Sequence, residues 1–163
     1  MRQDVTALAK KELFSLPIIG VILKAMRIIR VDRQSGRAHE AMQGVGEAVR
    51  RDGQVLIVYP QATRTKPGVR RKLKSGVYHL AQETGLPVYT VASNAGLFWT
   101  RGFFHRSGTI VFEIGPKLPA FETKADFMAA IEERVVFDSE KLMAEAGFGH
   151  LLSAQPATDV RTQ

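Results

Sequence analysis

Several short apolar runs rich in β-branched residues constrain the fold of this chain more than any other feature. They are Gln54–Tyr59 (QVLIVY), Pro87–Ala92 (PVYTVA), Thr109–Ile114 (TIVFEI) and the shorter Ile28–Val31. Runs of this length and composition are typical of buried strands. Stretches with apolar residues at helical spacing alternate with them, namely Ala38–Arg51, Ser75–Glu83 and Ala125–Ala146. Strands that alternate with helices predict an α/β fold, with a mixed, mainly parallel sheet flanked by helices.

The length and composition fit one domain with its own core. The chain has 163 residues, of which 45% are hydrophobic and 24% charged, as in ordinary folded proteins. We expect a single domain over residues 1–152 and a disordered polar tail over residues 153–163. The chain contains no cysteine, which excludes a disulfide framework, a thiolate nucleophile and a cysteine-based zinc site.

The most apolar run, Leu13–Leu23, is too short to cross a membrane, because a spanning helix needs about 20 residues. The first residues also lack the apolar segment of a signal peptide. Two interpretations of Leu13–Leu23 stay open, a core element and a membrane-surface element. The second is favoured by the flanking cations Lys10, Lys11, Lys24, Arg27 and Arg30.

An aromatic cluster leaves a similar choice. It consists of Phe98, Trp99, Phe103 and Phe104, bounded by Arg101 and Arg106. If these rings are exposed they suit a lipid interface, and if they are buried they pack the core.

The positive charge of the chain is concentrated in one segment. Lys and Arg total 23 against 16 Asp and Glu, a net charge of +7 that favours anionic partners. The segment from Arg64 to Lys74 has no acid and contains Arg64, Lys66, Arg70, Arg71, Lys72 and Lys74. It follows a predicted strand, and ligands of α/β sheets bind beyond the carboxyl ends of strands.

This placement predicts a phosphate site in the loop from Pro60 to Lys74. Thr63 offers a hydroxyl and Arg64 a planar guanidinium suited to phosphate. A second arginine, Arg33, follows the run Ile28–Val31. Charge alone also allows a solvated basic loop with no ligand.

Three long segments follow one another along the chain, AKKELFSLPIIGVILKAMRIIRVDR, QVLIVYPQATR and KSGVYHLAQETGLPVYTVASNAGLFW. In order and spacing they resemble the 1-acylglycerol-3-phosphate acyltransferase family, the lysophosphatidic acid acyltransferases. The resemblance covers Leu8 to Ala146 and implies a glycerolphosphate acyltransferase-like fold.

The resemblance also implies which residues bind the substrate phosphate. Lys10 matches the lysine of the family's Ala-Lys-x-Glu-Leu block, and Arg33 ends the block that reads Ile-Asp-Arg. Thr63 and Arg64 end Tyr59–Arg64, which matches the glycerol-phosphate block Phe-Pro-Glu-Gly-Thr-Arg. We therefore expect phosphate binding by Lys10, Arg33, Thr63 and Arg64.

The chain departs from the family at its catalytic block, a His followed five positions later by Asp, which lies upstream of Ala-Lys-x-Glu-Leu. In that pair the His is the general base and the Asp orients it. Here the residues five positions after His39, His79, His105 and His150 are Gly44, Thr84, Ile110 and Gln155. We therefore expect a chain truncated at its N-terminus, with no catalytic residue of this kind.

The second departure lies in the glycerol-phosphate block, whose Pro60 is kept but whose Glu-Gly is replaced by Gln61-Ala62. Glutamine cannot carry the charge of glutamate. Alanine adds a Cβ, which is costly if the backbone needs a positive φ.

The function implied by the resemblance is acyl transfer to 1-acylglycerol 3-phosphate, which gives phosphatidate in phospholipid biosynthesis. The acyl donor would be acyl-CoA or acyl carrier protein, with no further cofactor. Because the His/Asp pair is missing, we expect this chain by itself to be inactive. The alternative is a non-catalytic module that binds anionic lipid or lysophosphatidate.

The expected partners are lysophosphatidate, the acyl donor and an anionic membrane surface. Nucleic acid is not expected, because the basic segment has no recognised nucleic-acid motif. We expect the protein to lie peripherally on the cytoplasmic face of the inner membrane, or to be soluble in the cytoplasm if the truncation is real.

Overall fold

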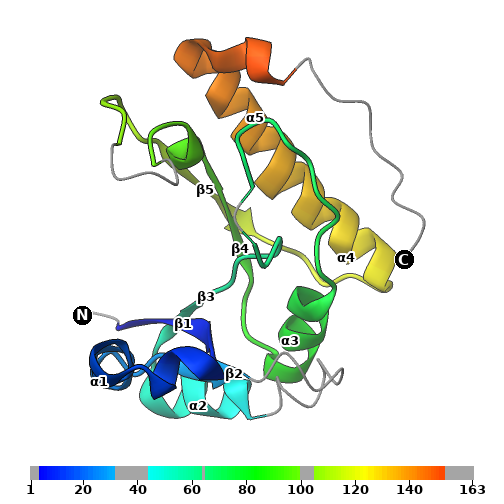
Figure 1. Cartoon of the computed structure of the whole chain (residues 1–163). Coiled ribbons are helices and arrows are strands. Elements are labelled where there is room, and N and C mark those ends of the chain that lie inside the picture. Colours follow the sequence, from blue (N-terminus) through cyan, green and yellow to red (C-terminus); the bar gives the residue numbers. More distant parts are fainter. Residues whose placement is uncertain (1–3, 32–43, 64, 100–104, 153–163) are drawn as a thin grey trace, which may run out of the picture. The chain divides into compact units, whose positions relative to one another are not determined.

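The computed structural model describes residues 4–31, 44–63, 65–99 and 105–152, and its chain divides into two compact units (Figure 1). Unit 1 comprises Met1–Pro60 and Lys74–Leu86, and unit 2 comprises Gln61–Leu73 and Pro87–Gln163. The α/β class expected from the sequence is confirmed. The single domain expected over residues 1–152 stays a prediction, and the tail expected over residues 153–163 lies outside the described residues.

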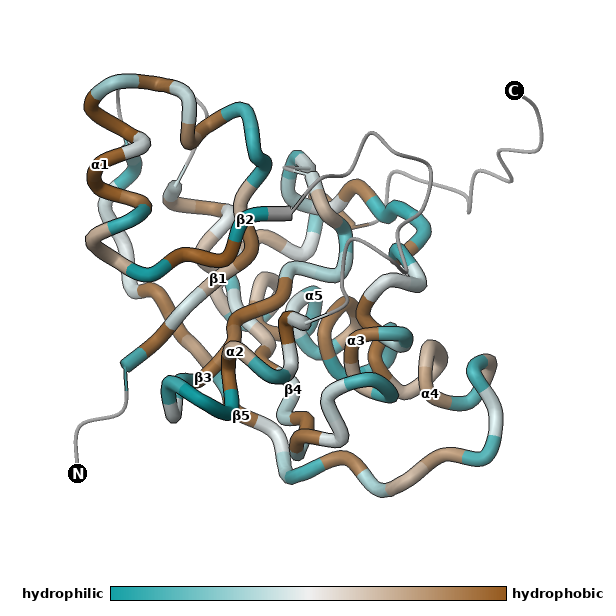
Figure 2. Tube along the Cα trace, turned by 90° about the horizontal axis from the view of Figure 1, so that it is seen from below, coloured by the Kyte–Doolittle hydropathy of each residue, from teal (hydrophilic) through white to brown (hydrophobic). Residues whose placement is uncertain are grey.

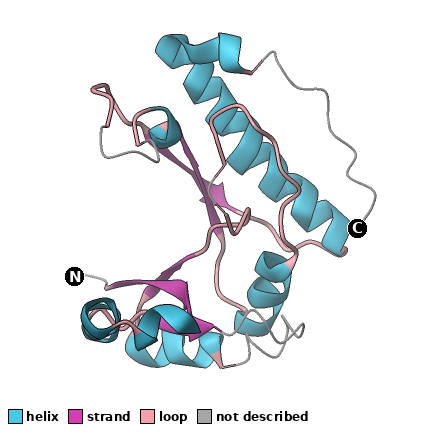
Figure 3. Ribbon diagram, in the orientation of Figure 1, coloured by secondary structure: helices cyan, strands magenta, loops and turns pink. Residues whose placement is uncertain are grey.

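Unit 1 contains a parallel three-stranded sheet, shown in Figure 3. Its strands are β1 (Val5–Lys10), β2 (Ile29–Val31) and β3 (Val55–Ile57), in the order β2-β1-β3. The Cα partners include Lys10 with Val31 and Ala7 with Ile57. The central strand β1 was not predicted, because its alanines have low strand propensity and hide the alternation.

Helices cover one face of this sheet. They are α2 (Val45–Asp52) and α3 (Gly76–Thr84). Their buried side chains Val45, Val49 and Leu80 form the centre of a hydrophobic cluster. Leu8, Ile29, Leu56, Val58 and Leu86 pack against that cluster. Side chains of a strand alternate between the two faces. Accordingly Val5, Val55 and Ile57 on the other face are 42–51% exposed.

The remaining elements of unit 1 follow β1 directly. A 3₁₀ turn, η1 (Lys11–Ser15), leads into helix α1 (Pro17–Ala25), with Pro17 in the first turn, where a missing N–H costs little. Helix α2 begins at Val45, after Gly44 with φ +77°. The first part of the predicted helix Ala38–Arg51 lies outside the described residues.

Unit 2 packs an antiparallel strand pair against a long helix. The strands are β4 (Tyr89–Ser93) and β5 (Phe112–Lys117), with Val91 opposite Ile114. The helical run consists of α4 (Lys124–Ile131), the π-helical η4 (Glu132–Phe137), α5 (Asp138–Met143) and the π-helical η5 (Ala144–Phe148), seen in Figure 1 as one long helix that ends at a kink at Gly147, where φ is +86°. The helix predicted over Ala125–Ala146 is therefore confirmed.

Side chains connect these elements. Thr123 caps α4, because its Oγ1 accepts a hydrogen bond from the Asp126 N–H at 3.1 Å. Ser93 N–H donates to Ser139 Oγ at 3.0 Å, which joins β4 to α5. Short 3₁₀ turns, η3 (Ala95–Leu97) and η6 (Gly149–Leu151), complete the unit, with Leu97, Phe98 and Met143 buried together.

The strand predicted over Thr109–Ile114 is shifted toward the C-terminus, and a buried amide explains the shift. Asn94 Nδ2 donates to the Thr109 carbonyl at 3.3 Å, and Val111 N–H donates to Asn94 Oδ1 at 2.9 Å. The Asn94 side chain thus takes the place of a strand partner for Thr109 and Val111. Ladder pairing begins only at Phe112, opposite Ser93.

Candidate functional site

The carboxyl edge of the parallel sheet in unit 1 carries the first part of the candidate site. Lys10 is the last residue of β1 and is exposed, and its Cα partner Val31 ends β2. The chain continues from Val31 toward Arg33, which lies outside the described residues. Strand β3 ends at the same edge and leads to Pro60. The parallel register therefore gathers these segments where ligands of α/β sheets bind.

A backbone hydrogen bond within unit 1 brings the two ends of the basic loop, Pro60 and Lys74, together. Lys74 N–H donates to the Pro60 carbonyl at 2.8 Å. Helix α3 follows at Gly76. The loop Gln61–Leu73 therefore leaves and re-enters unit 1 at neighbouring points, although the loop itself belongs to unit 2.

The altered part of the glycerol-phosphate block has a defined geometry. Gln61 Oε1 accepts a hydrogen bond from Thr65 Oγ1 at 3.1 Å, a role that a carboxylate would also fill. Ala62 has φ +54°, so this position adopts the left-handed conformation that suits glycine. An L-residue with a Cβ loses about 1–2 kcal/mol there. Thr63 is exposed, and Arg64 lies outside the described residues.

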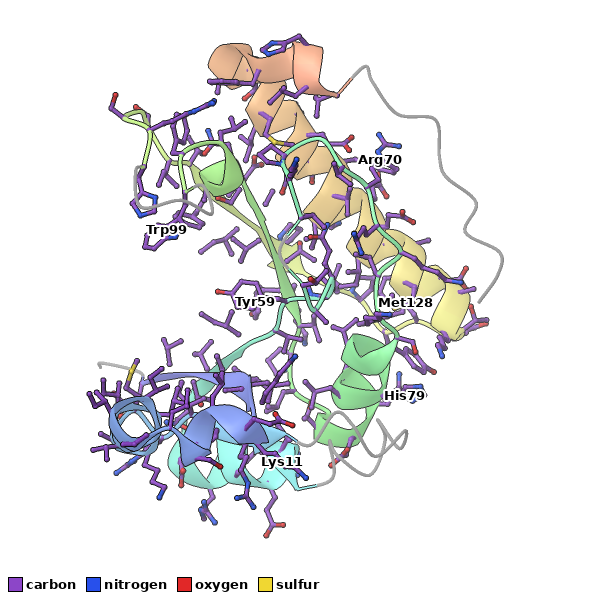
Figure 4. The ribbon with its side chains drawn as sticks, in the orientation of Figure 1. Lys11, Tyr59, Arg70, His79, Trp99 and Met128 are labelled. Atoms are coloured by element: carbon purple, nitrogen blue, oxygen red, sulfur yellow. The ribbon has the colours of Figure 1, made fainter. Side chains whose placement is uncertain are left out.

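The loop is held against the long helix of unit 2. Arg70 makes a bidentate pair with Glu140, with Nε–Oε1 at 2.7 Å and Nη2–Oε2 at 2.6 Å. The Arg70 guanidinium also lies 4.7 Å from the centre of the Phe137 ring, and Figure 4 places Arg70 beside the long helix. The hydrogen bond to Glu140 raises the pKa of Arg70 above its ordinary value. This cation is thus engaged within the protein.

Packing fixes the loop at two further points. Gly68, with φ +80°, lies so close to the Leu151 carbonyl that no Cβ would fit, and Leu73 is buried. Lys66, Arg71 and Lys72 remain exposed and can attract an anion. The loop therefore combines an anchored backbone with outward cations, and its phosphate-binding role stays a prediction.

The histidines make ring contacts of their own. His79 on α3 meets Tyr78 edge-on at 5.5 Å, His105 lies 5.0 Å from Trp99, and His150 lies 6.1 Å from Phe148. His39 lies outside the described residues. Of the aromatic cluster, Phe98 is buried and Trp99 is 69% exposed, whereas Phe103 and Phe104 are not described.

The described residues hold neither a cluster of metal ligands nor a helix that could span a membrane. Among them, no group of three or more His, Cys, Asp or Glu side chains could hold a metal ion. Nor do the described helices include one with the length and apolar character that crossing a membrane requires.

Sequence reasoning missed two sets of contacts at the loop. Thr65, the partner of Gln61, lies four positions further along the chain, a spacing that could have suggested it. Glu140 and Phe137, the partners of Arg70, lie about seventy residues away and left no signal in the sequence.

Comparison with known proteins identifies relatives. The chain is 29% identical over 145 residues to the 1-acyl-sn-glycerol-3-phosphate acyltransferase of Pseudomonas aeruginosa, which covers 88% of this chain and 56% of the relative. It is 29% identical over 129 residues to the human 1-acyl-sn-glycerol-3-phosphate acyltransferase beta, covering 77% of this chain and 46% of the relative. The chain thus spans about half the length of these curated relatives.

A solved structure shares the fold. The crystal structure of the 1-acyl-sn-glycerophosphate acyltransferase PlsC from Thermotoga maritima matches with a TM-score of 0.68 and 21% identity. The match covers 86% of this chain and 58% of that one. The family model named Acyltransferase matches residues 1–94, which include Lys10 and the whole Tyr59–Arg64 block. The chain therefore belongs to the acyltransferase family.

Proposed function

We propose that this chain forms the acyl-acceptor part of an enzyme that makes phosphatidate. The reaction transfers an acyl group from acyl-CoA or acyl carrier protein to the free hydroxyl of 1-acylglycerol 3-phosphate. The observation that carries the proposal is the carboxyl edge of the parallel sheet, where exposed Lys10 ends β1 and β3 leads into Tyr59–Arg64. Family membership and the names of the relatives support it.

The proposed role of the site is to hold the acceptor phosphate. Lys10, Arg33 and Arg64 supply positive charge, and charge-assisted hydrogen bonds to phosphate are among the stronger polar contacts in proteins. Thr63 adds a hydroxyl donor. No cofactor besides the acyl donor is needed, because the donor thioester is already activated for attack.

Acyl transfer also needs a base. The acceptor hydroxyl must lose its proton as its oxygen attacks the thioester carbonyl, and the released thiol takes up a proton. None of the four histidines is followed by Asp at the family's spacing. We therefore propose that residues 1–163 by themselves bind lysophosphatidate without forming phosphatidate.

Calorimetry with a short-chain, monomeric lysophosphatidate tests the acceptor site. We expect saturable binding that weakens about tenfold or more in Lys10→Ala and in Arg64→Ala, the loss of one charged hydrogen bond. Lys117→Ala removes a cation of β5, outside the proposed site, and serves as the matched control. Unchanged binding by both site variants would contradict the proposal.

Mass spectrometry of phosphatidate tests turnover. The purified chain is mixed with lysophosphatidate and acyl-CoA, and no product above the protein-free rate is expected. Product formation that disappears in a variant of any one of the four histidines, His39, His79, His105 or His150, would show that the chain is a complete enzyme. The binding role would then be part of catalysis.

We also propose that the protein works at an anionic membrane surface on the cytoplasmic side of the cell membrane. Its proposed acceptor and product are anionic lipids, and its net charge of +7 favours such a surface.

A further inference from the structure

Helix α1 is apolar on nearly every side, yet most of it is exposed. Of Pro17–Ala25, Gly20 is the buried residue, whereas Ile18 is 76%, Val21 67% and Ile22 51% exposed. Helices that are apolar all round are normally buried in a protein core or in a membrane. We therefore expect the exposed surface of α1 to be covered by an apolar partner.

The helix is held in place, so its exposed side chains form an ordered surface. Gly20 packs against the Phe14 carbonyl of η1 with no room for a Cβ. At the other end, Ile28 N–H donates to the Leu23 carbonyl at 2.9 Å and Arg27 N–H to the Lys24 carbonyl at 3.0 Å, a Schellman ending with Arg27 at φ +52°. Buried Thr6 of β1 donates its hydroxyl to the Arg27 carbonyl at 2.9 Å.

Charge indicates what covers this surface. Between Lys10 and Arg30 the only acid is Glu12, against the cations Lys10, Lys11, Lys24, Arg27 and Arg30. Figure 2 shows the apolar colours of α1 interrupted and flanked by hydrophilic ones. An apolar helix bordered by lysine and arginine is complementary to an anionic bilayer, whose acyl chains take apolar side chains and whose phosphates attract cations.

We propose that α1 is the membrane-binding element of this protein. It lies in the interface of an anionic bilayer, with Ile18, Val21 and Ile22 in the acyl boundary and the flanking cations at the headgroups. This inference deepens the proposed function, because it supplies the lipid surface from which an acyl acceptor would be taken. Its test does not depend on acceptor binding.

Co-sedimentation with vesicles tests the apolar contribution. The full chain is titrated with vesicles of phosphatidylcholine containing roughly 30% phosphatidylglycerol. The double variant Ile18→Asn/Val21→Asn is expected to lower the partition coefficient about tenfold or more, since burying such side chains drives interfacial binding.

The structure offers a closely matched control. Ile114 and Phe112 of β5 are 72% and 65% exposed, close to the 76% and 67% of Ile18 and Val21. Phe112→Asn/Ile114→Asn removes similar apolar area elsewhere and should leave vesicle binding unchanged. Equal loss in both double variants, or no loss in the α1 variant, would overturn the inference. Because all four side chains are exposed, circular dichroism and Tm should show that both variants fold.

Two more measurements separate lipid from other coverings. Binding to the anionic vesicles should weaken strongly as the salt concentration rises from about 0.1 M to about 0.5 M, because salt screens the charge attraction. Binding should also be weak on vesicles of pure phosphatidylcholine, because their headgroups carry no net charge. In a Trp99→Phe background, the indole introduced by Ile22→Trp should be quenched by brominated acyl chains, and that introduced by Ile114→Trp should not. Concentration-dependent dimerisation lost in the α1 variant, without quenching, would instead assign the surface to a second copy.

The two proposals fail separately. If Ile18→Asn/Val21→Asn loses vesicle binding but keeps calorimetric binding of monomeric lysophosphatidate, both stand. If monomeric lysophosphatidate does not bind while vesicles still do, the acceptor site fails and the membrane role of α1 stands.

Discussion

Units 1 and 2 both expose apolar side chains and both carry many cations, but they combine these features differently. In unit 1 the exposed helix α1 is flanked by Lys10, Lys11, Lys24, Arg27 and Arg30. In unit 2 the exposed apolar side chains of β4 and β5 share those strands with one acid and one cation, Glu113 and Lys117. Equal exposure therefore does not indicate the same partner, and the accompanying charge is the reason why a lipid surface is proposed for α1 and not for the strands of unit 2.

Arg70 of unit 2 and Lys10 of unit 1 differ in how far they are engaged. In unit 2 the bidentate pair with Glu140 and the Phe137 ring hold Arg70. In unit 1 Lys10 ends its strand exposed at the carboxyl edge of the sheet. A count of basic residues thus overstates the charge that unit 2 offers to a ligand.

The sharpest test of the comparison is whether the two units unfold independently. Leu80 of unit 1 and Leu97 of unit 2 are 4% and 2% exposed, so each Leu→Ala change should cost about 3 kcal/mol of unfolding free energy in its own unit. Trp99, the only tryptophan, belongs to unit 2. In urea, its fluorescence transition should move with Leu97→Ala and stay in place with Leu80→Ala. If both variants shift that transition equally, the units unfold as one.

A smaller effect is expected from the ion pair of unit 2. Arg70→Ala should lower the unfolding free energy by about 1 kcal/mol, a modest value because the arginine side chain is 53% exposed and the pair is screened by solvent. Glu140→Gln should reproduce most of this loss, and the double variant should lose less than the sum of the two. Strict additivity in urea titrations would show that the pair contributes nothing.

Each unit has a non-glycine residue in the left-handed region. Ala62→Gly in unit 2 and Arg27→Gly in unit 1 should each raise the unfolding free energy by roughly 0.5–1 kcal/mol, because relief of the Cβ strain exceeds the added entropy of the unfolded chain. The matched control is Gly53→Ala, at φ +61° with nothing within 4 Å of the added Cβ, which should destabilise by a similar amount. A loss of stability in either glycine variant would show that its native conformation is not strained.

The smallest expected effect concerns pH. In unit 1 the hydrogen bond from Arg51 lowers the pKa of Asp52 below its ordinary value. A carboxyl with a lowered folded pKa stabilises the fold above its unfolded pKa of about 3.9, and this contribution is lost as the pH falls through the folded value. Asp52→Asn should therefore slightly flatten the acid limb of the stability curve from about pH 5 downward. An unchanged acid limb in chemical denaturation would show that the exposed pair has no effect.

Much of the fold could be predicted from the sequence, because its strands and helices have clear periodicities. The runs at Gln54–Tyr59 and Pro87–Ala92 and the last helix were recognised in this way. Strand β1 was not, since its alanines hide the alternation and, of its residues, Thr6 alone is buried. The shift of β5 depends on Asn94, whose amide binds a segment far along the chain.

The candidate site was predictable only in part. The concern about a Cβ at position 62 is supported by the positive φ of Ala62. The contacts of Gln61 with Thr65 and of Arg70 with Glu140 depend on the folded loop, which no periodicity encodes. The phosphate-binding roles of Lys10, Arg33, Thr63 and Arg64 stay predictions for the binding experiments.

Gly20 should differ from the other residues of helix α1 in which substitutions it tolerates. A fluid bilayer does not select the shape of a side chain, so Ile18, Ile19, Val21 and Ile22 should exchange freely with other apolar residues. Gly20 has no such freedom, because the Phe14 carbonyl occupies the place where a Cβ would stand. A scan of apolar substitutions along α1 should therefore show one intolerant position, Gly20, among neighbours that accept other apolar side chains, the reverse of the profile of a helix packed into a protein core.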